Sequence, residues 1–172
     1  MKNMAIGIFV VILVMSFMQP LLEVSNLLKE KVTLGAAILN SCRAARNNAI
    51  ASVDYYGSEW NMGDMNAYID EEEFRRFFAE AFAETLHLDD SVDATVNPMI
   101  FRANERWNEI TVWVWLDYED SGDFENRGIT RATVEVETPY LFQTSLLQRA
   151  AAASSVVYDI REETVFLVQI IN

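Results

Sequence analysis

The sequence predicts an α+β protein, in which a long N-terminal hydrophobic and amphipathic helix precedes a small, mostly antiparallel β-sheet domain with one or two further helices. Apolar residues recur at helical spacing from the N-terminus to about residue 52. Residues 109–118 and 129–137 instead alternate with a period of two, as strands do. We therefore place an N-terminal helix at residues 1–52 and an acidic globular domain at residues 53–172.

The two parts carry opposite charge. The 172-residue chain has a formal charge of -13, which divides into +3 for residues 1–52 and -16 for residues 53–172. A body this acidic argues against direct nucleic-acid binding, because phosphate contacts need basic side chains. A single Cys and a single His exclude an intramolecular disulfide and the usual zinc clusters, so no metal or cofactor is expected.

The first part of the helix is apolar enough to span a membrane. No charged residue occurs from Ala5 to Leu22. As a helix these residues would extend about 27 Å, close to the ~30 Å hydrocarbon core. A cleaved signal peptide is the main alternative, but the apolar run exceeds the roughly 7–15 residues expected and no small-x-small cleavage site follows. A retained anchor is favoured, although the flanking charges do not decide its orientation.

The helix is expected to continue to Ser52, with apolar residues forming one stripe along its surface. Its members recur every three or four residues: Leu21, Val24, Leu28, Val32, Gly35, Ile38, Cys42, Ala45 and Ala49. Pro20 lies inside the apolar run and predicts a kink or an unwound turn near residues 17–19. Cys42 is interpreted as a small apolar packing residue, with intermolecular pairing as an alternative.

Small residues crowd the second half of this helix, between Gly35 and Ser52. Such residues allow helix backbones to approach closely. Packing of the helix on its own domain and packing among helices of several subunits explain them equally well.

A second helix is expected from Met65 or Asp70 to Leu86. Asp70 and Glu73 have the spacing of a capping box. Six residues form its apolar stripe and are assigned to the core: Phe74, Phe77, Phe78, Ala81, Phe82 and Leu86.

The remaining elements are predicted to be mainly strands. Residues 109–118 and 129–137 should form a hairpin, with a bulge or a late start in the second strand. A strand near residues 96–102 would add a third. Pro139 suits the first turn of a helix that would run to about Ala153. Residues 155–160 and 164–171 suggest a final hairpin turning at Arg161.

Candidate chemical sites are few. The loop at residues 117–125 is acidic and invites a calcium interpretation, but it departs from the EF-hand pattern, and a solvated hairpin loop is favoured. His87 follows a helix end and is interpreted as a cap or surface residue. No catalytic motif is present in the sequence, so we do not expect an enzyme.

The N-terminal layout resembles the N-terminal helix of type IV pilins: a short polar start, an apolar span, a proline near its end and an amphipathic continuation. The run of small residues at 34–49 is similar to the TadE-like pilin family. The resemblance implies a subunit that is anchored in the membrane and then assembled, with other pilus-machinery proteins, into a filament whose core is the bundled helices.

We therefore expect a structural, pilin-like subunit that polymerises with itself into a filament at the cell surface. The alternative is a single-pass, membrane-anchored accessory or binding protein of a secretion or conjugation apparatus. The expected anchor and filament-core residues are Ile6, Ile8, Phe9, Val11, Ile12, Leu13, Phe17, Pro20, Leu21, Val24, Leu28, Val32, Gly35, Ile38, Cys42, Ala45 and Ala49.

Overall fold

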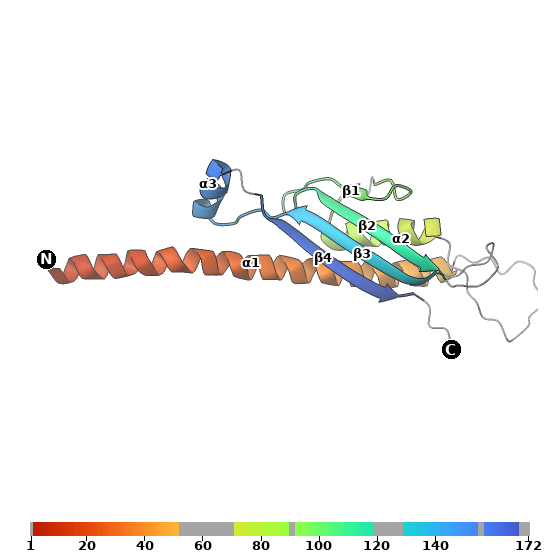
Figure 1. Cartoon of the computed structure of the whole chain (residues 1–172), viewed down its shortest axis with the longest axis horizontal. Helices are drawn as coiled ribbons and strands as arrows, with labels where there is room; N and C mark the ends of the chain where they lie inside the picture. Colours follow the sequence, from red (N-terminus) through yellow and green to blue (C-terminus); the bar gives the residue numbers. More distant parts are fainter. Residues whose placement is uncertain (1, 52–70, 90–91, 119–128, 155–156, 169–172) are drawn as a thin grey trace, which may run out of the picture.

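The computed structural model describes residues 2–51, 71–89, 92–118, 129–154 and 157–168, and it confirms the predicted α+β class. In chain order the elements are α1 (Lys2–Ala51), α2 (Glu71–Leu86), β1 (Met99–Phe101), β2 (Ile110–Tyr118), β3 (Ile129–Pro139), α3 (Ser145–Ser154) and β4 (Asp159–Leu167). Figure 1 shows α1 as a rod whose N-terminal part projects beyond the sheet and the other helices.

The long helix is confirmed, but the unwound turn predicted at Pro20 is not present. α1 is a continuous α-helix of 50 residues with Pro20 inside it, and Figure 1 shows no sharp bend there. Proline removes one backbone hydrogen bond. The intact turns on either side hold the helical path across that single gap.

The strands form one antiparallel sheet in the order β1-β2-β3-β4. The predicted β2–β3 hairpin and the strand before it are confirmed. Asp117 pairs with Arg131 whereas Tyr118 pairs with Ile129, so the register shifts by one residue. This irregularity confirms the predicted bulge and returns Ile129 to the buried face of β3.

The predicted final hairpin is wrong, because a single strand, β4, runs through the proposed turn. Arg161, Glu162 and Glu163 pair with Glu137, Val136 and Glu135 of β3. The acidic cluster looked like a turn, yet its side chains alternate: Arg161 and Glu163 are exposed and Glu162 is half-buried. An edge strand tolerates charge on its open face, which explains the misassignment.

Pro139 is not at a helix start, which corrects a second prediction. It ends β3 opposite Asp159, and the N–H of Tyr140 then donates to the carbonyl of Tyr158 at 2.7 Å. The chain therefore stays extended past the proline. α3 begins later, where the N–H of Gln148 bonds the carbonyl of Thr144 at 2.9 Å.

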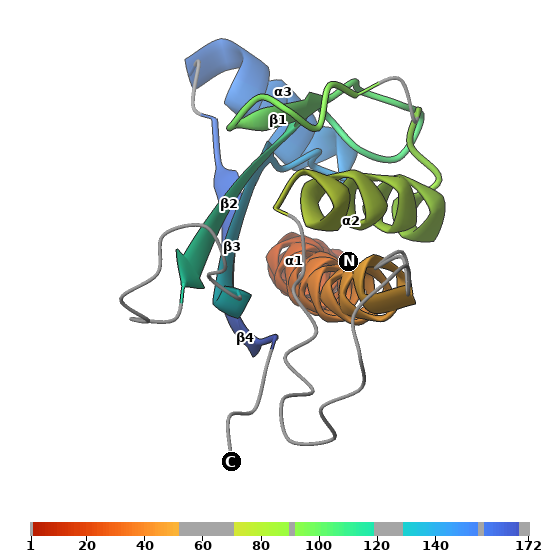
Figure 2. The same ribbon diagram turned by 90° about the vertical axis from the view of Figure 1, so that its right-hand side faces the viewer.

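Both longer helices pack on one face of the sheet, as Figure 2 shows. The confirmed core residues of α2 are Phe74, Phe78, Phe82 and Leu86, while Phe77 and Ala81 are half-buried. They join side chains of the sheet and of α1 in one hydrophobic cluster. The predicted capping partner Asp70 lies outside the described residues.

Candidate functional site

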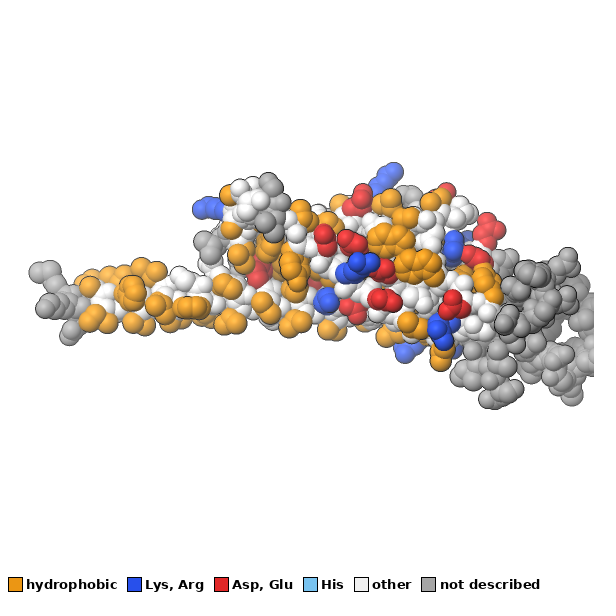
Figure 3. Space-filling model, in the orientation of Figure 1, with side chains coloured by type: hydrophobic (Ala, Val, Ile, Leu, Met, Phe, Trp, Pro, Cys, Tyr) orange, Lys and Arg blue, Asp and Glu red, His pale blue; other side chains and the backbone are white. Residues whose placement is uncertain are grey.

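The N-terminal part of α1 exposes apolar side chains on every face. From Met4 to Leu22, each large apolar residue keeps between 44% and 73% of its surface accessible. The helix is long and apolar enough to cross a membrane, with a mean hydropathy of 2.4 over an 18-residue window that the body does not cover. Figure 3 shows this apolar rod emerging from a body studded with charged side chains. Such a surface needs an apolar environment.

The structure places the seventeen expected anchor and core residues in two groups. The exposed group contains Ile6, Ile8, Phe9, Val11, Ile12, Leu13, Phe17, Pro20, Leu21, Val24, Leu28 and Val32. The covered group contains Ile38, Cys42, Ala45 and Ala49, which are buried, and Gly35, which is half-buried. The expected single stripe is therefore split, because its first half faces away from the body.

The face of α1 that the body does cover carries two acids at its N-terminal end. Glu23 and Glu30 are 5% and 8% exposed, and Leu34 follows them on the same side of the helix. Residues 23, 27, 30, 34 and 38 have helical spacing, so this face was readable in the sequence. The sequence analysis did not identify this face, because it followed the apolar residues alone and the two glutamates are not part of that pattern.

Glu23 fastens the chain after β3 to α1. Its Oε2 accepts a hydrogen bond from the Tyr140 hydroxyl at 2.8 Å. Its Oε1 accepts bonds from the Thr144 backbone N–H at 2.7 Å and from the Thr144 hydroxyl at 3.1 Å. Hydrogen bonds to a charged group are stronger than neutral ones. We call this set of three contacts the Glu23 clasp.

Contacts within the clasp and burial shift the pKa values of Glu23 and Tyr140. Burial acts to raise the pKa of Glu23, but the hydrogen bonds from Thr144 and Tyr140 outweigh it and hold the pKa below its ordinary value. The pKa of the Tyr140 phenol is raised, first by burial and then by the bonded carboxylate. Glu23 is therefore ionised and Tyr140 is a neutral donor at physiological pH.

Glu30, two turns further on, lacks such compensation. Burial is the largest influence and raises its pKa, and the negative charge of Glu23 adds to the increase. The positive charge of Arg106 acts in the opposite direction but does not cancel these effects. The entry of α1 into the body thus combines a well-bonded carboxylate with a poorly compensated one.

The C-terminal half of α1 is absorbed into the body's own core. Leu34, Ala37, Ile38, Cys42 and Ala45 are all fully buried, and α1 packs most extensively on α2 and then on β4. Packing within one chain therefore accounts for these buried positions, whereas Ala36 in the same segment is exposed. At the β4 side, Lys31 lies 3.8 Å from the Glu162 carboxylate.

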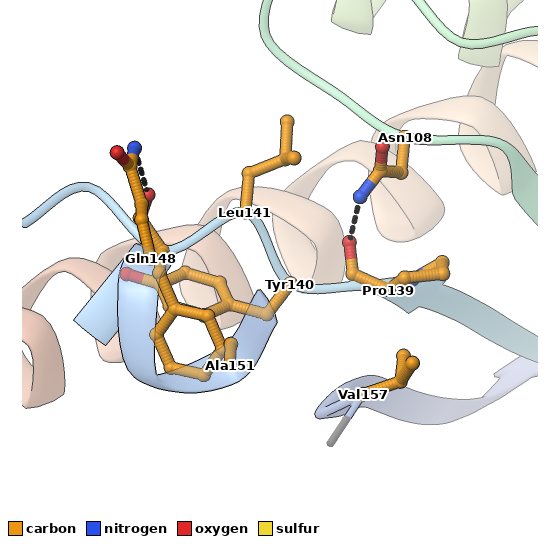
Figure 4. A pocket seen from close by; sticks show the side chains of 8 residues that line it. Asn108, Pro139, Tyr140, Leu141, Gln148, Ala151 and Val157 are labelled. Atoms are coloured by element: carbon orange, nitrogen blue, oxygen red, sulfur yellow. Dashed lines mark hydrogen bonds between the residues drawn. The ribbon is translucent and has the colours of Figure 1, made fainter. Parts of the chain in front are cut away.

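A shallow, largely apolar depression of about 430 Å³ lies between the end of β3 and α3. Figure 4 shows it bounded by two side-chain amides that donate to backbone carbonyls: Asn108 to Pro139 at 2.9 Å and Gln148 to Phe142 at 2.7 Å. Tyr140, Leu141, Ala151 and Val157 complete the lining. With both amides engaged, few polar groups remain in the depression to orient a small substrate.

Of the other sites considered in the sequence, the structure describes His87 fully and the acidic loop only in part. His87 is exposed and adopts a positive φ of 55° just after α2. Next to it, the Leu88 N–H bonds the Ala83 carbonyl at 2.8 Å, so His87 closes the helix. The acidic loop at residues 117–125, expected to be a solvated hairpin loop, lies mostly outside the described residues. Within the described ranges, no group of three or more His, Cys, Asp or Glu side chains is placed to hold a metal.

Comparisons with protein-family models, with curated proteins and with solved structures found no match.

Proposed function

We propose that this protein is a structural, pilin-like subunit that is anchored in a membrane through α1 and then polymerises with itself into a cell-surface filament. The observation that supports this proposal is the exposed apolar surface of α1, which extends beyond the length a bilayer would cover. Residues 5–22 suffice for a hydrocarbon core. Leu28 and Val32 lie past it and remain 55% and 72% exposed.

Leu28 and Val32 distinguish a helix that assembles with others from one that only anchors the protein in a membrane. A membrane anchor needs no apolar side chains beyond the bilayer, whereas a bundle of α1 helices needs an apolar seam along the segment that follows. Leu21, Val24, Leu28 and Val32 recur every three or four residues and would supply that seam. In the filament they would contact the same helix of neighbouring copies.

The test is a charge placed on the seam. We expect Val32→Lys to abolish filaments at the cell surface while leaving membrane insertion and the folded body intact, because Val32 is exposed and lies outside the apolar run. Val165→Lys is the matched control, since Val165 is 55% exposed on β4. Filaments would be counted by electron microscopy, and normal assembly of Val32→Lys would contradict the proposal.

A second function remains in competition: a membrane-anchored accessory protein that stays monomeric. The burial of Ala37, Cys42 and Ala45 within their own chain favours it, because those residues are then unavailable to a neighbouring helix. In that case Val32→Lys and Val165→Lys would behave alike. Crosslinking between copies in the native membrane would also remain at background.

A further inference from the structure

One segment of the acidic body contains no acid. Residues 138–158 hold a single charged side chain, Arg149, although residues 53–172 as a whole carry -16. The segment comprises the end of β3, the loop that follows, α3 and the approach to β4. No other stretch of the body is free of acids over so many residues.

The Glu23 clasp fixes where that segment lies. Glu23 is the first residue after the apolar run 5–22, and it holds Tyr140 and Thr144 by hydrogen bonds of 2.7 to 3.1 Å. Of the body's elements, α3 lies furthest toward the N-terminal end of α1 (Figure 1). The acid-free segment is therefore the part of the body nearest to the apolar run.

The described part of the segment also exposes apolar side chains. Leu141, Val157 and Tyr158 are 38%, 65% and 51% exposed, and three alanines of α3 face solvent: Ala150, Ala152 and Ala153. Tyrosine is enriched at membrane–water interfaces, and arginine can extend its charge from an apolar surface toward phosphates. Amphipathic helices that carry apolar residues on one face and cationic residues on the other lie in the plane of the interface.

We propose that residues 138–154, together with residues 157 and 158, form a membrane-contacting surface that rests in the lipid headgroup layer when α1 spans the bilayer. The proposal rests on the membrane-anchoring part of the proposed function and does not require a filament. An 18-residue helix covers about 27 Å, and the headgroup layer adds roughly 5–8 Å on each side of the core. Groups bonded to Glu23 fall within that layer.

The test compares three valines of the full chain, each changed to Cys in a Cys42→Ala background and labelled with an environment-sensitive fluorophore. Val11 reports the apolar run, Val157 the acid-free segment and Val165 the exposed face of the sheet, and their exposures are 57%, 65% and 55%. The protein is reconstituted at low density in phosphatidylcholine vesicles that contain lipids with a nitroxide in the chain or on the headgroup.

We expect chain nitroxides to quench the label at 11, headgroup nitroxides to quench the label at 157, and neither to quench the label at 165. A label at 157 that behaves like the one at 165 would overturn the proposal and leave the anchor intact. A label at 157 that is shielded but unquenched by lipid would assign the surface to a second copy instead. An unquenched label at 11 would overturn the anchor itself.

A second variant tests the same surface without a label at Val157. Val157→Asp should reduce headgroup quenching of a label at Leu141→Cys by about twofold or more, because a carboxylate opposes burial in the interface. Val165→Asp is the control and should leave that quenching unchanged. Equal quenching in both variants would contradict the proposal.

Discussion

Glu23 makes the hydrogen bonds that attach the segment after β3 to α1. It is buried, it is ionised, and it accepts all three hydrogen bonds of the clasp. Its folded pKa lies below the ordinary value of 4.5. Its contribution to stability is therefore complete above about pH 4.5 and is lost as the pH falls through the folded pKa.

We predict that Glu23→Gln lowers the free energy of unfolding by about 1–3 kcal/mol at neutral pH, because buried donors lose a charged acceptor. The loss should shrink as the pH falls below 4.5. Glu30 has a raised pKa and gives the opposite slope. Because the charge of Glu23 contributes to that increase, the difference between variant and wild type reports Glu23 together with its effect on Glu30. Denaturation in detergent measures it, with exposed Glu163→Gln as the control; a pH-independent difference would contradict the account.

Cys42 provides a second test at the same scale. It is 0% exposed, and burial raises the pKa of its thiol to about 12. We predict that thiol reagents at pH 8 leave it unmodified in the folded protein and react with it fully after denaturation. A Val165→Cys variant, reacting at once, verifies the reagent. Recovery of a Cys42–Cys42 disulfide from native material would contradict this placement.

At the scale of elements, α1 is one helix with two environments, and Gly35 lies where they meet. A Cβ added at Gly35 would lie 3.5 Å from Oε1 of Glu162, an ordinary contact. We predict that Gly35→Ala raises the free energy of unfolding of the body by about 0.5–1 kcal/mol, because glycine weakens a helix interior. Gly35→Leu should lower it by displacing Glu162 from Lys31.

Gly7→Ala is the matched control for that pair of variants. Gly7 lies on the same helix with nothing near its added Cβ, and it is remote from the body's core. Urea titration followed by tryptophan fluorescence, to which the buried Trp107 contributes, would compare the three variants. Destabilisation by Gly35→Ala would show that α1 and β4 approach each other more closely than described.

Most of the helices and strands were predictable from the local spacing of apolar residues. The helices α1 and α2, the β2–β3 hairpin and its bulge all followed from spacing of apolar residues. The extended path through Pro139 and the straight course of β4 did not, because both depend on pairing with a strand remote in sequence. The Glu23 clasp was equally hidden, since its partners lie 117 and 121 residues away.

At the scale of the whole molecule, the structure is an acidic body built around the C-terminal half of an apolar rod. The body buries Ala37, Ser41, Cys42, Ala45 and Ala49, which are among the small residues that left two packing arrangements open in the sequence, and it leaves Leu28 and Val32 exposed. The surface proposed for assembly is therefore the exposed seam of Leu21, Val24, Leu28 and Val32.

The most direct test of the central claim is electron microscopy of material sheared from native cell surfaces, with this chain identified by mass spectrometry. The account predicts helical filaments that contain the chain, with α1 helices bundled along the axis and the acidic bodies outside. Recovery of the chain only from detergent-extracted membranes, as a monomer, would contradict it.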